Sequence, residues 1–229
     1  MTLRRRCPAA VLSIVLVSLA AAPAAAQSWF RIGGGLADMA MEDVNDSDYS
    51  FYEESISGYD FPDVGTGFLL DLAFGYDVGP ELGVGFHWDR QWAQVSGNDG
   101  GVDGTLNLNA NAFVGRVQWR PLRGQKWRLG AVLGTGPLFC DGSTRISRDT
   151  VDYGEGKLTG MAWSFDAAVG YDRRIREHTL LQLWAGWRWA NLDEVKHDDA
   201  PVLKDDGSNM TLDYTGWVMR LGLVFEFGD

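Results

Sequence analysis

The stretch GFLLDLAFGYD, residues 67–77, alternates large apolar side chains with small or acidic ones. The even-numbered positions are all large and apolar, whereas the odd-numbered positions include Asp71, Ala73 and Gly75. Residues 81–92, ELGVGFHWDRQW, repeat the alternation. Side chains on a β-strand point to opposite faces in turn, so both stretches predict strands with one apolar face. Such strands occur in water-soluble sandwiches and in membrane barrels, and the surrounding sequence has to distinguish the two.

The first residues have the pattern of a secretory signal peptide. Three arginines at 4–6 precede an apolar run at 11–22, and the alanines at 24–26 supply small residues before a cleavage site. This order predicts a signal peptide, residues 1–26, with cleavage before Gln27. The apolar run is too short to cross a bilayer as a helix.

The predicted mature chain, residues 27–229, has the length of one domain. Removal of the three arginines raises its formal negative charge from −11 to −14. Such an acidic chain is a poor partner for nucleic acid, which we do not expect it to bind. Cys140 is the one cysteine of this part, so no disulfide can form within it.

Eight segments of the mature chain are predicted to be strands, and their connections alternate in length. The strands are 29–37, 67–77, 81–92, 105–120, 127–139, 158–172, 179–190 and 210–227. The connections expected to be longer are 38–66, 93–104, 140–157 and 191–209, and those expected to be short are 78–80, 121–126 and 173–178. Tight turns at one end and long loops at the other are typical of outer-membrane barrels. We therefore predict an all-β fold: a closed antiparallel eight-stranded transmembrane β-barrel with short periplasmic turns and long external loops.

Tryptophans cluster near the ends of these strands, where a membrane barrel carries aromatic girdles. The predicted girdle consists of Trp29, Trp88, Trp92, Trp119, Trp127, Trp187 and Trp189.

Polar side chains on the opposite strand faces predict a paired, charged lumen, since eight strands leave room only for side chains. The predicted lumen network is Arg31, Asp71, His87, Asp89, Arg128, Asp166, Arg188, Arg220 and Glu226. On the fourth strand Asn107, Asn109 and Asn111 are also expected to face inward. Whether the side chains of residues 113–119 and 214–218 alternate in the same way stays open, because a bulge would move them to the other face.

The whole mature chain resembles the small eight-stranded outer-membrane barrels of Gram-negative bacteria, the OmpA/OmpX-type barrels. The resemblance rests on the signal peptide, the strand count, the connection lengths and the closing strand MRLGLVFEF, residues 219–227. It implies an outer-membrane location, contact with the lipid bilayer and lipopolysaccharide, and recognition of the closing strand by the barrel-insertion machinery. Phe227 departs from the usual signal because Gly228 and Asp229 follow it.

The predicted external connections are acidic. Residues 38–66 hold nine acidic residues and no Lys or Arg, and residues 191–209 hold six acidic residues and two lysines. The segment 43–54 partly matches a calcium-binding loop but has Asp48 where the glycine is expected. Divalent cations are therefore a candidate partner of these connections, where they would bridge to lipopolysaccharide phosphates, although no specific metal ligands are assigned.

The sequence offers no recognisable catalytic machinery, so no catalytic residue and no cofactor are predicted. His87 and Asp89 share a strand face, and an interior polar network accounts for them; Ser164 is a candidate neighbour that sequence cannot place. We expect a non-enzymatic barrel with a structural or surface-interaction role through its acidic external connections. The alternatives are a lipid A-modifying hydrolase of barrel form, a narrow passive pore, and a soluble periplasmic ligand-binding barrel.

Overall fold

The chain is described here from a computed structural model. The described residues are 27–41, 63–99, 102–123, 126–148, 151–197, 199–202, 204 and 207–228. Their long strands are β1 (Ser28–Asp38), β2 (Thr66–Asp77), β3 (Leu82–Asp99), β4 (Val102–Arg123), β5 (Trp127–Arg148), β6 (Val151–Arg176), β7 (Thr179–Trp189) and β12 (Gly216–Phe227). Four two-residue strands lie between β7 and β12: β8 (Asn191–Leu192), β9 (Lys196–His197), β10 (Ala200–Pro201) and β11 (Leu212–Asp213). The predicted signal peptide and the calcium-like segment 43–54 lie outside the described residues.

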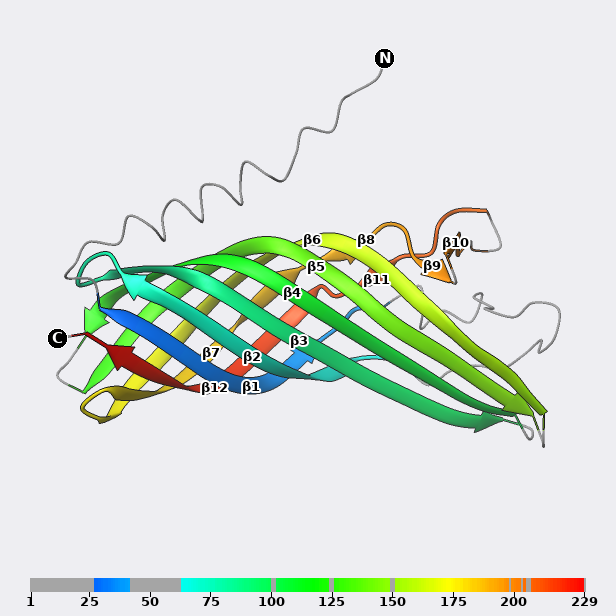
Figure 1. Ribbon diagram of the computed structural model, residues 1–229, viewed down its shortest axis with the longest axis horizontal. Helices are drawn as coiled ribbons and strands as arrows, with labels where there is room; N and C mark the ends of the chain where they lie inside the picture. The colour runs from blue at the N-terminus through cyan, green and yellow to red at the C-terminus, as the bar shows by residue number, and fades with distance from the viewer. Residues whose placement is uncertain are drawn as a thin grey trace, which may run out of the picture.

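The eight long strands close into one antiparallel ring (Figure 1). Each strand pairs with its neighbours in sequence from β1 to β7, and β12 joins β7 to β1. Closure pairs the backbone groups within the wall, which a bilayer requires because it offers them no water. The predicted closed eight-stranded barrel is confirmed. Within the described ranges, no helix is long and apolar enough to cross a membrane.

The two ends of the barrel differ. The connections β2–β3 and β6–β7 lie at the same end as the C-terminus (Figure 1), and the second spans only Glu177 and His178. This is the periplasmic end of a barrel of this type. At the other end β3 to β6 run on well past the rest of the wall as two slanted hairpins (Figure 1).

These hairpins correct two predicted loops. Residues 93–99, 102–104, 140–148 and 151–157, expected in the third and fifth connections, are strand, and only residues 100–101 and 149–150 separate the two strands of each hairpin. Their Gly, Asn, Asp and Ser content suggested loops, but the ladders continue because each strand end pairs with its neighbour. The closing strand is shorter than predicted, and 210–215 largely precede it.

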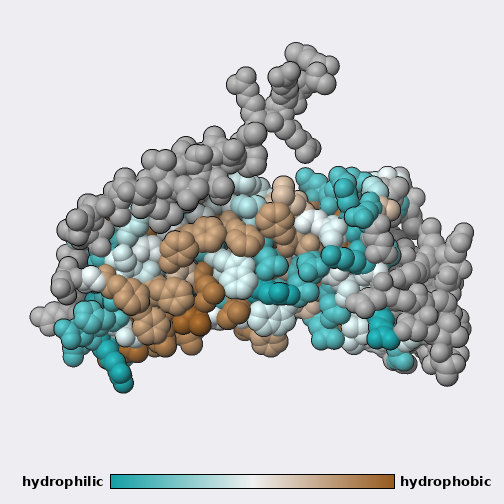
Figure 2. All heavy atoms as spheres, in the orientation of Figure 1, coloured by the Kyte–Doolittle hydropathy of each residue, from teal (hydrophilic) through white to brown (hydrophobic). Residues whose placement is uncertain are grey.

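The outer surface has two zones. Toward the periplasmic end it is apolar, and Phe74, Phe86, Phe113 and Phe139 form a continuous row of outward rings 5.7–6.3 Å apart. Figure 2 shows this apolar patch and its replacement by hydrophilic residues toward the hairpins. From the outward side chains, the membrane-spanning segments are 30–36, 68–74, 82–92, 113–119, 129–139, 161–171, 181–189 and 217–227.

The interior reverses its polarity at the same level. Within the membrane zone it holds buried charges, whereas beyond it Leu106, Leu108 and Leu158 are buried in an apolar core. The β3–β4 ladder keeps one register over its whole length, so the odd-numbered residues of β4 from Asp103 to Trp119 face outward. The inward placement predicted for Asn107, Asn109 and Asn111 is therefore wrong. Above the bilayer water surrounds the wall, and apolar side chains turn inward instead.

Candidate functional site

The centre of the barrel is a cluster of carboxylates and guanidiniums from several strands. Arg188 on β7 forms two-pronged contacts with Asp166 on β6 (2.8 and 2.9 Å) and with Asp89 on β3 (2.5 and 3.0 Å). Arg220 on β12 reaches the same two carboxylates at 3.1 and 3.0 Å. Bidentate geometry makes such pairs stronger than single contacts, and it compensates part of the cost of burial.

A second pair lies beside this cluster. Arg31 on β1 donates to Asp71 on β2, and its other nitrogen donates to Gln182 on β7 at 2.7 Å. His87 places Nε2 3.3 Å from Asp89 and 3.7 Å from Asp71. All of these side chains are buried. The structure thus brings Arg31, Asp71, His87, Asp89, Asp166, Arg188 and Arg220 of the predicted lumen network together.

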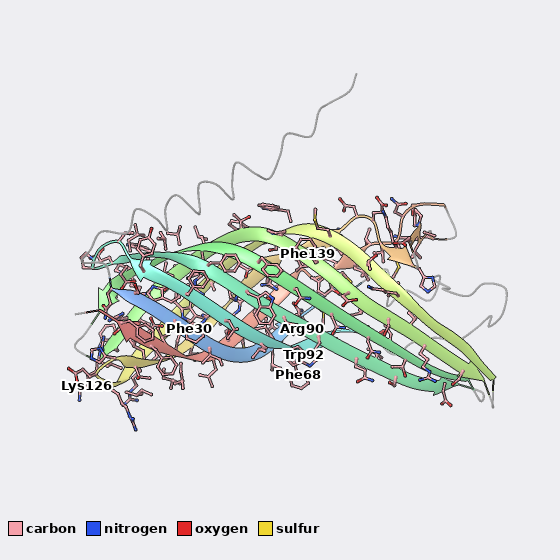
Figure 3. The ribbon with its side chains drawn as sticks, viewed as in Figure 1. Phe30, Phe68, Arg90, Trp92, Lys126 and Phe139 are labelled. Atoms are coloured by element: carbon pink, nitrogen blue, oxygen red, sulfur yellow. The ribbon has the colours of Figure 1, made fainter. Side chains whose placement is uncertain are left out.

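The remaining two members, Arg128 and Glu226, lie in a separate network near the periplasmic end. Glu226 accepts from Arg128 at 2.8 Å and from Arg174 at 2.6 Å. Nearby, Arg120 pairs with Asp77 at 3.1 Å. Figure 3 shows that Lys126 lies at this end as well.

Sequence reasoning missed several interior groups. Arg116, Gln118 and Arg120 alternate along β4 and all point inward. They occupy the same even-numbered positions as the apolar Leu106 and Leu108 earlier on the strand. This unbroken alternation along β4 was the sequence signal that could have placed them inside.

Trp29 is a correction to the predicted girdle. Its ring is 4% exposed and lies inside the barrel. Gly75 and Gly85 leave the space for it, since a Cβ on either would come within 2.9 Å of the ring. Trp184 is also inward, with Gly170 opposite its ring.

The other predicted girdle residues sit on the outward face. Trp92, Trp119, Trp127, Trp187 and Trp189 are exposed, and Trp88 is partly covered. Trp92 stacks against Phe68 with ring centroids 6.4 Å apart, and Figure 3 shows Arg90 beside them. Arg90 is an exposed cation at the upper edge of the apolar zone. It stands where the headgroups of the outer leaflet would meet the wall.

Two arrangements that would support catalysis or metal binding are already engaged in other contacts. Ser164 donates to the carbonyl of Gly136 at 2.9 Å, so its hydroxyl is held by the backbone of β5. His87, Asp89 and Asp166 place ligand atoms within 4.8 Å of one another. Both carboxylates, however, already bind Arg188 and Arg220, and a metal ion there would sit against two guanidiniums.

Above the charged centre the barrel is closed by its apolar core. The segment that follows β1, the segment that leads into β2 and those between β7 and β12 fold inward and pack against the inner wall of β4 to β6. The buried members include Met39, Met41, Val64, Leu106, Leu108, Leu138, Leu158, Leu192, Val195, Met210, Leu212 and Tyr214. Tyr214 Oη lies 3.3 Å from Cys140 Sγ in this core. Burial raises the pKa of the Cys140 thiol to about 11.

Comparison with known proteins supports the fold and goes no further. No family model matches the sequence, and no curated protein matches it. Three similar solved structures are outer-membrane proteins. Ail of Yersinia pestis, in complex with the heparin analogue sucrose octasulfate, is 13% identical over 88% of this chain and 99% of its own, with a TM-score of 0.50. OprG of Pseudomonas aeruginosa is 16% identical over 90% and 97%, with a TM-score of 0.49.

A major outer membrane protein of Thermus thermophilus is 12% identical over 87% of this chain and 99% of its own, with a TM-score of 0.48. At these identities the likeness concerns the fold. Together with the lipid-facing apolar zone and the closed ring, it makes this chain an outer-membrane β-barrel with the architecture of the small OmpA/OmpX-like group.

Proposed function

We propose that this barrel conducts nothing through its centre and acts as a rigid support for its extracellular hairpins and acidic connections. The observation that carries the proposal is that the lumen is filled at three successive levels. Ion pairs fill the periplasmic end, the central cluster fills the middle, and the apolar core fills the top. A conducting pore needs a continuous water path, and the side chains of an eight-stranded barrel leave little space for one.

The exposed part of the wall supports a role in surface contact. The hairpins β3–β4 and β5–β6 extend beyond the apolar zone with polar outward side chains such as Asn109 and Asp141. The paired strands and the apolar core behind them hold these hairpins in a fixed direction, so that a partner meets an ordered surface. Such preorganisation lowers the entropic cost of binding.

The charge of the external connections indicates which kind of partner they would bind. Ail was crystallised with a sulfated polyanion. In our chain the connections 38–66 and 191–209 carry fifteen acidic residues against two lysines, and like charges repel. We therefore propose cationic surfaces, or anionic ones bridged by divalent cations, as the partners. Arg90, at the upper edge of the lipid-facing zone, supports direct contact with lipopolysaccharide phosphates.

Two measurements test this function. In planar bilayers the reconstituted protein should give no stepwise conductance, and a reproducible ohmic pore would refute the filled lumen. Protein in nanodiscs should bind immobilised polylysine, and should bind heparin only when calcium is present. A variant with residues 43–62 replaced by a short Gly-Ser linker is the matched control and should lose most polylysine binding. Equal binding by both forms would refute the role of the acidic connection.

A further inference from the structure

The central region of the barrel holds one more buried arginine than aspartate. In the central region Arg31, Arg188 and Arg220 all contact aspartates. Arg116 is 5% exposed, and no described carboxylate lies within ion-pair distance of its guanidinium. Its contacts are instead the rings of Trp29 and Trp184, whose centroids lie 5.4 and 6.0 Å from its Cζ. Cation–π contacts recover only part of the cost of burying a charge.

A small cavity of about 10 Å³ adjoins this guanidinium. Its polar lining is Arg31, His87, Arg116, Asp166, Trp184 and Arg220, and Val114, Val132, Gly134 and Ala168 complete the wall. This volume is about what one water-sized particle occupies. So small a space favours a monatomic anion over phosphate, sulfate or a larger organic anion.

Five buried nitrogen atoms of the side chains that line the cavity lack hydrogen-bond partners. They are Nε of Arg31, Arg116 and Arg220, Nε1 of Trp184 and Nε2 of His87. All five side chains are more than nine-tenths buried. Arginine and indole nitrogens are obligatory donors, so what they lack is an acceptor; Oδ1 of Asp71 is also without a partner, but Asp71 is not part of the cavity lining. A buried donor without an acceptor is costly, and several around one cavity point to one shared ligand.

The carboxylate in the lining does not supply this acceptor. Both oxygens of Asp166 already accept from Arg188 and Arg220. The four arginines of the region, Arg31, Arg116, Arg188 and Arg220, face three aspartates, Asp71, Asp89 and Asp166. The unmet requirement is therefore one negative charge, one atom in size, surrounded by N–H groups.

We propose that this cavity is a halide-binding site, occupied by chloride in the cell. The ion would accept from the unpartnered guanidinium and indole nitrogens and neutralise the charge of Arg116. Trp29 and Trp184, seated against glycines of the wall, would hold that guanidinium in place. The site would serve as a structural part of the lumen and requires no transport through the barrel.

Bromide tests the site because it resembles chloride and scatters anomalously. Crystals of the refolded protein grown in sodium bromide should show an anomalous peak in this cavity, and its absence would overturn the proposal. In solution the melting temperature should be about 5–11 °C higher in bromide at a hundredfold excess over its Kd than in gluconate of equal ionic strength.

Two variants of the same residue separate the ion from general stability. Arg116→Met removes the charge and should abolish the bromide-dependent shift, whereas Arg116→Lys keeps the charge and should retain part of it. If bromide and gluconate give the same melting temperature for the wild-type protein, the cavity holds water and the proposal fails. A shift of equal size in Arg116→Met would place the ion elsewhere and would also refute it. If Arg116→Met does not refold, the wild-type anomalous map still decides.

Discussion

Replacing Arg188 with methionine should destabilise the barrel more than any surface substitution. The side chain is fully buried and donates five hydrogen bonds, four to Asp89 and Asp166 and one to Gln91. After its removal, the two carboxylates share one nitrogen of Arg220. Breaking a buried pair by removing one partner costs about 3–5 kcal/mol, because a charge is left without compensation.

The assay is equilibrium unfolding in urea from phosphatidylcholine vesicles, followed by tryptophan fluorescence and by the heat-dependent mobility shift on gels. Arg188→Met should lower the free energy of unfolding by that amount at an unchanged dependence on urea. Adding Asp166→Asn should recover part of the loss, since one uncompensated charge is then removed.

Lys196→Met is the matched control. Lys196 pairs with Glu194 at 3.6 Å, but both side chains are about half exposed, so its loss should cost less than about 1 kcal/mol. The reasoning is refuted if Arg188→Met costs no more than the control. It is also refuted if the double variant is no more stable than Arg188→Met alone.

Three further predictions concern the extracellular part of the barrel. Leu106→Ala should cost about 2–5 kcal/mol in the same urea assay, and Asn107→Ala on the opposite face less than about 0.5 kcal/mol. In Cys140→Ala protein a water-soluble maleimide should label Asn109→Cys rapidly and Leu108→Cys hardly at all, and the reverse order would refute the assigned faces. The Cys140 thiol should resist maleimide at pH 7, because its pKa of about 11 leaves almost no thiolate. The folded pKa lies above the ordinary 9.0, so unfolding releases a proton and stability should fall as pH rises from about 9 to 11. Cys140→Ala should show a smaller fall in the same titration.

The closed eight-stranded ring could be predicted because alternation and strand spacing are local properties of the sequence. The strands read from 67–77 and 81–92 correspond to β2 and the first part of β3, with the expected apolar faces outward. The inward placement of the central charged side chains could also be predicted, because a charged side chain on a strand with lipid-facing apolar residues has to point inward.

The inward and outward faces of the extracellular half of the barrel could not be predicted in the same way. Alternation gives two faces but does not say which is inside, and that depends on whether lipid or water surrounds the strand. Assigning every polar face to the lumen placed Asn107 inward, whereas the wall there is surrounded by water. Trp29 shows a second limit, since its inward seat depends on Gly75 and Gly85 of neighbouring strands, which only the register brings opposite it.

The level at which polarity reverses locates the outer boundary of the bilayer on each strand. On β4 the outward residue changes from Phe113 to Asn111, while the inward one changes from Arg116 to Val114. On β5 the outward change runs from Phe139 to Asp141. Below this level the wall is stable only in lipid, because its apolar face would otherwise meet water. Above it, the same strands form a barrel end with an apolar core of the kind found in soluble proteins. The same strands thus face lipid with apolar side chains below this level and water with polar side chains above it, while the polarity of the interior changes in the opposite sense. The apolar interior above this level supports the hairpins beyond the membrane.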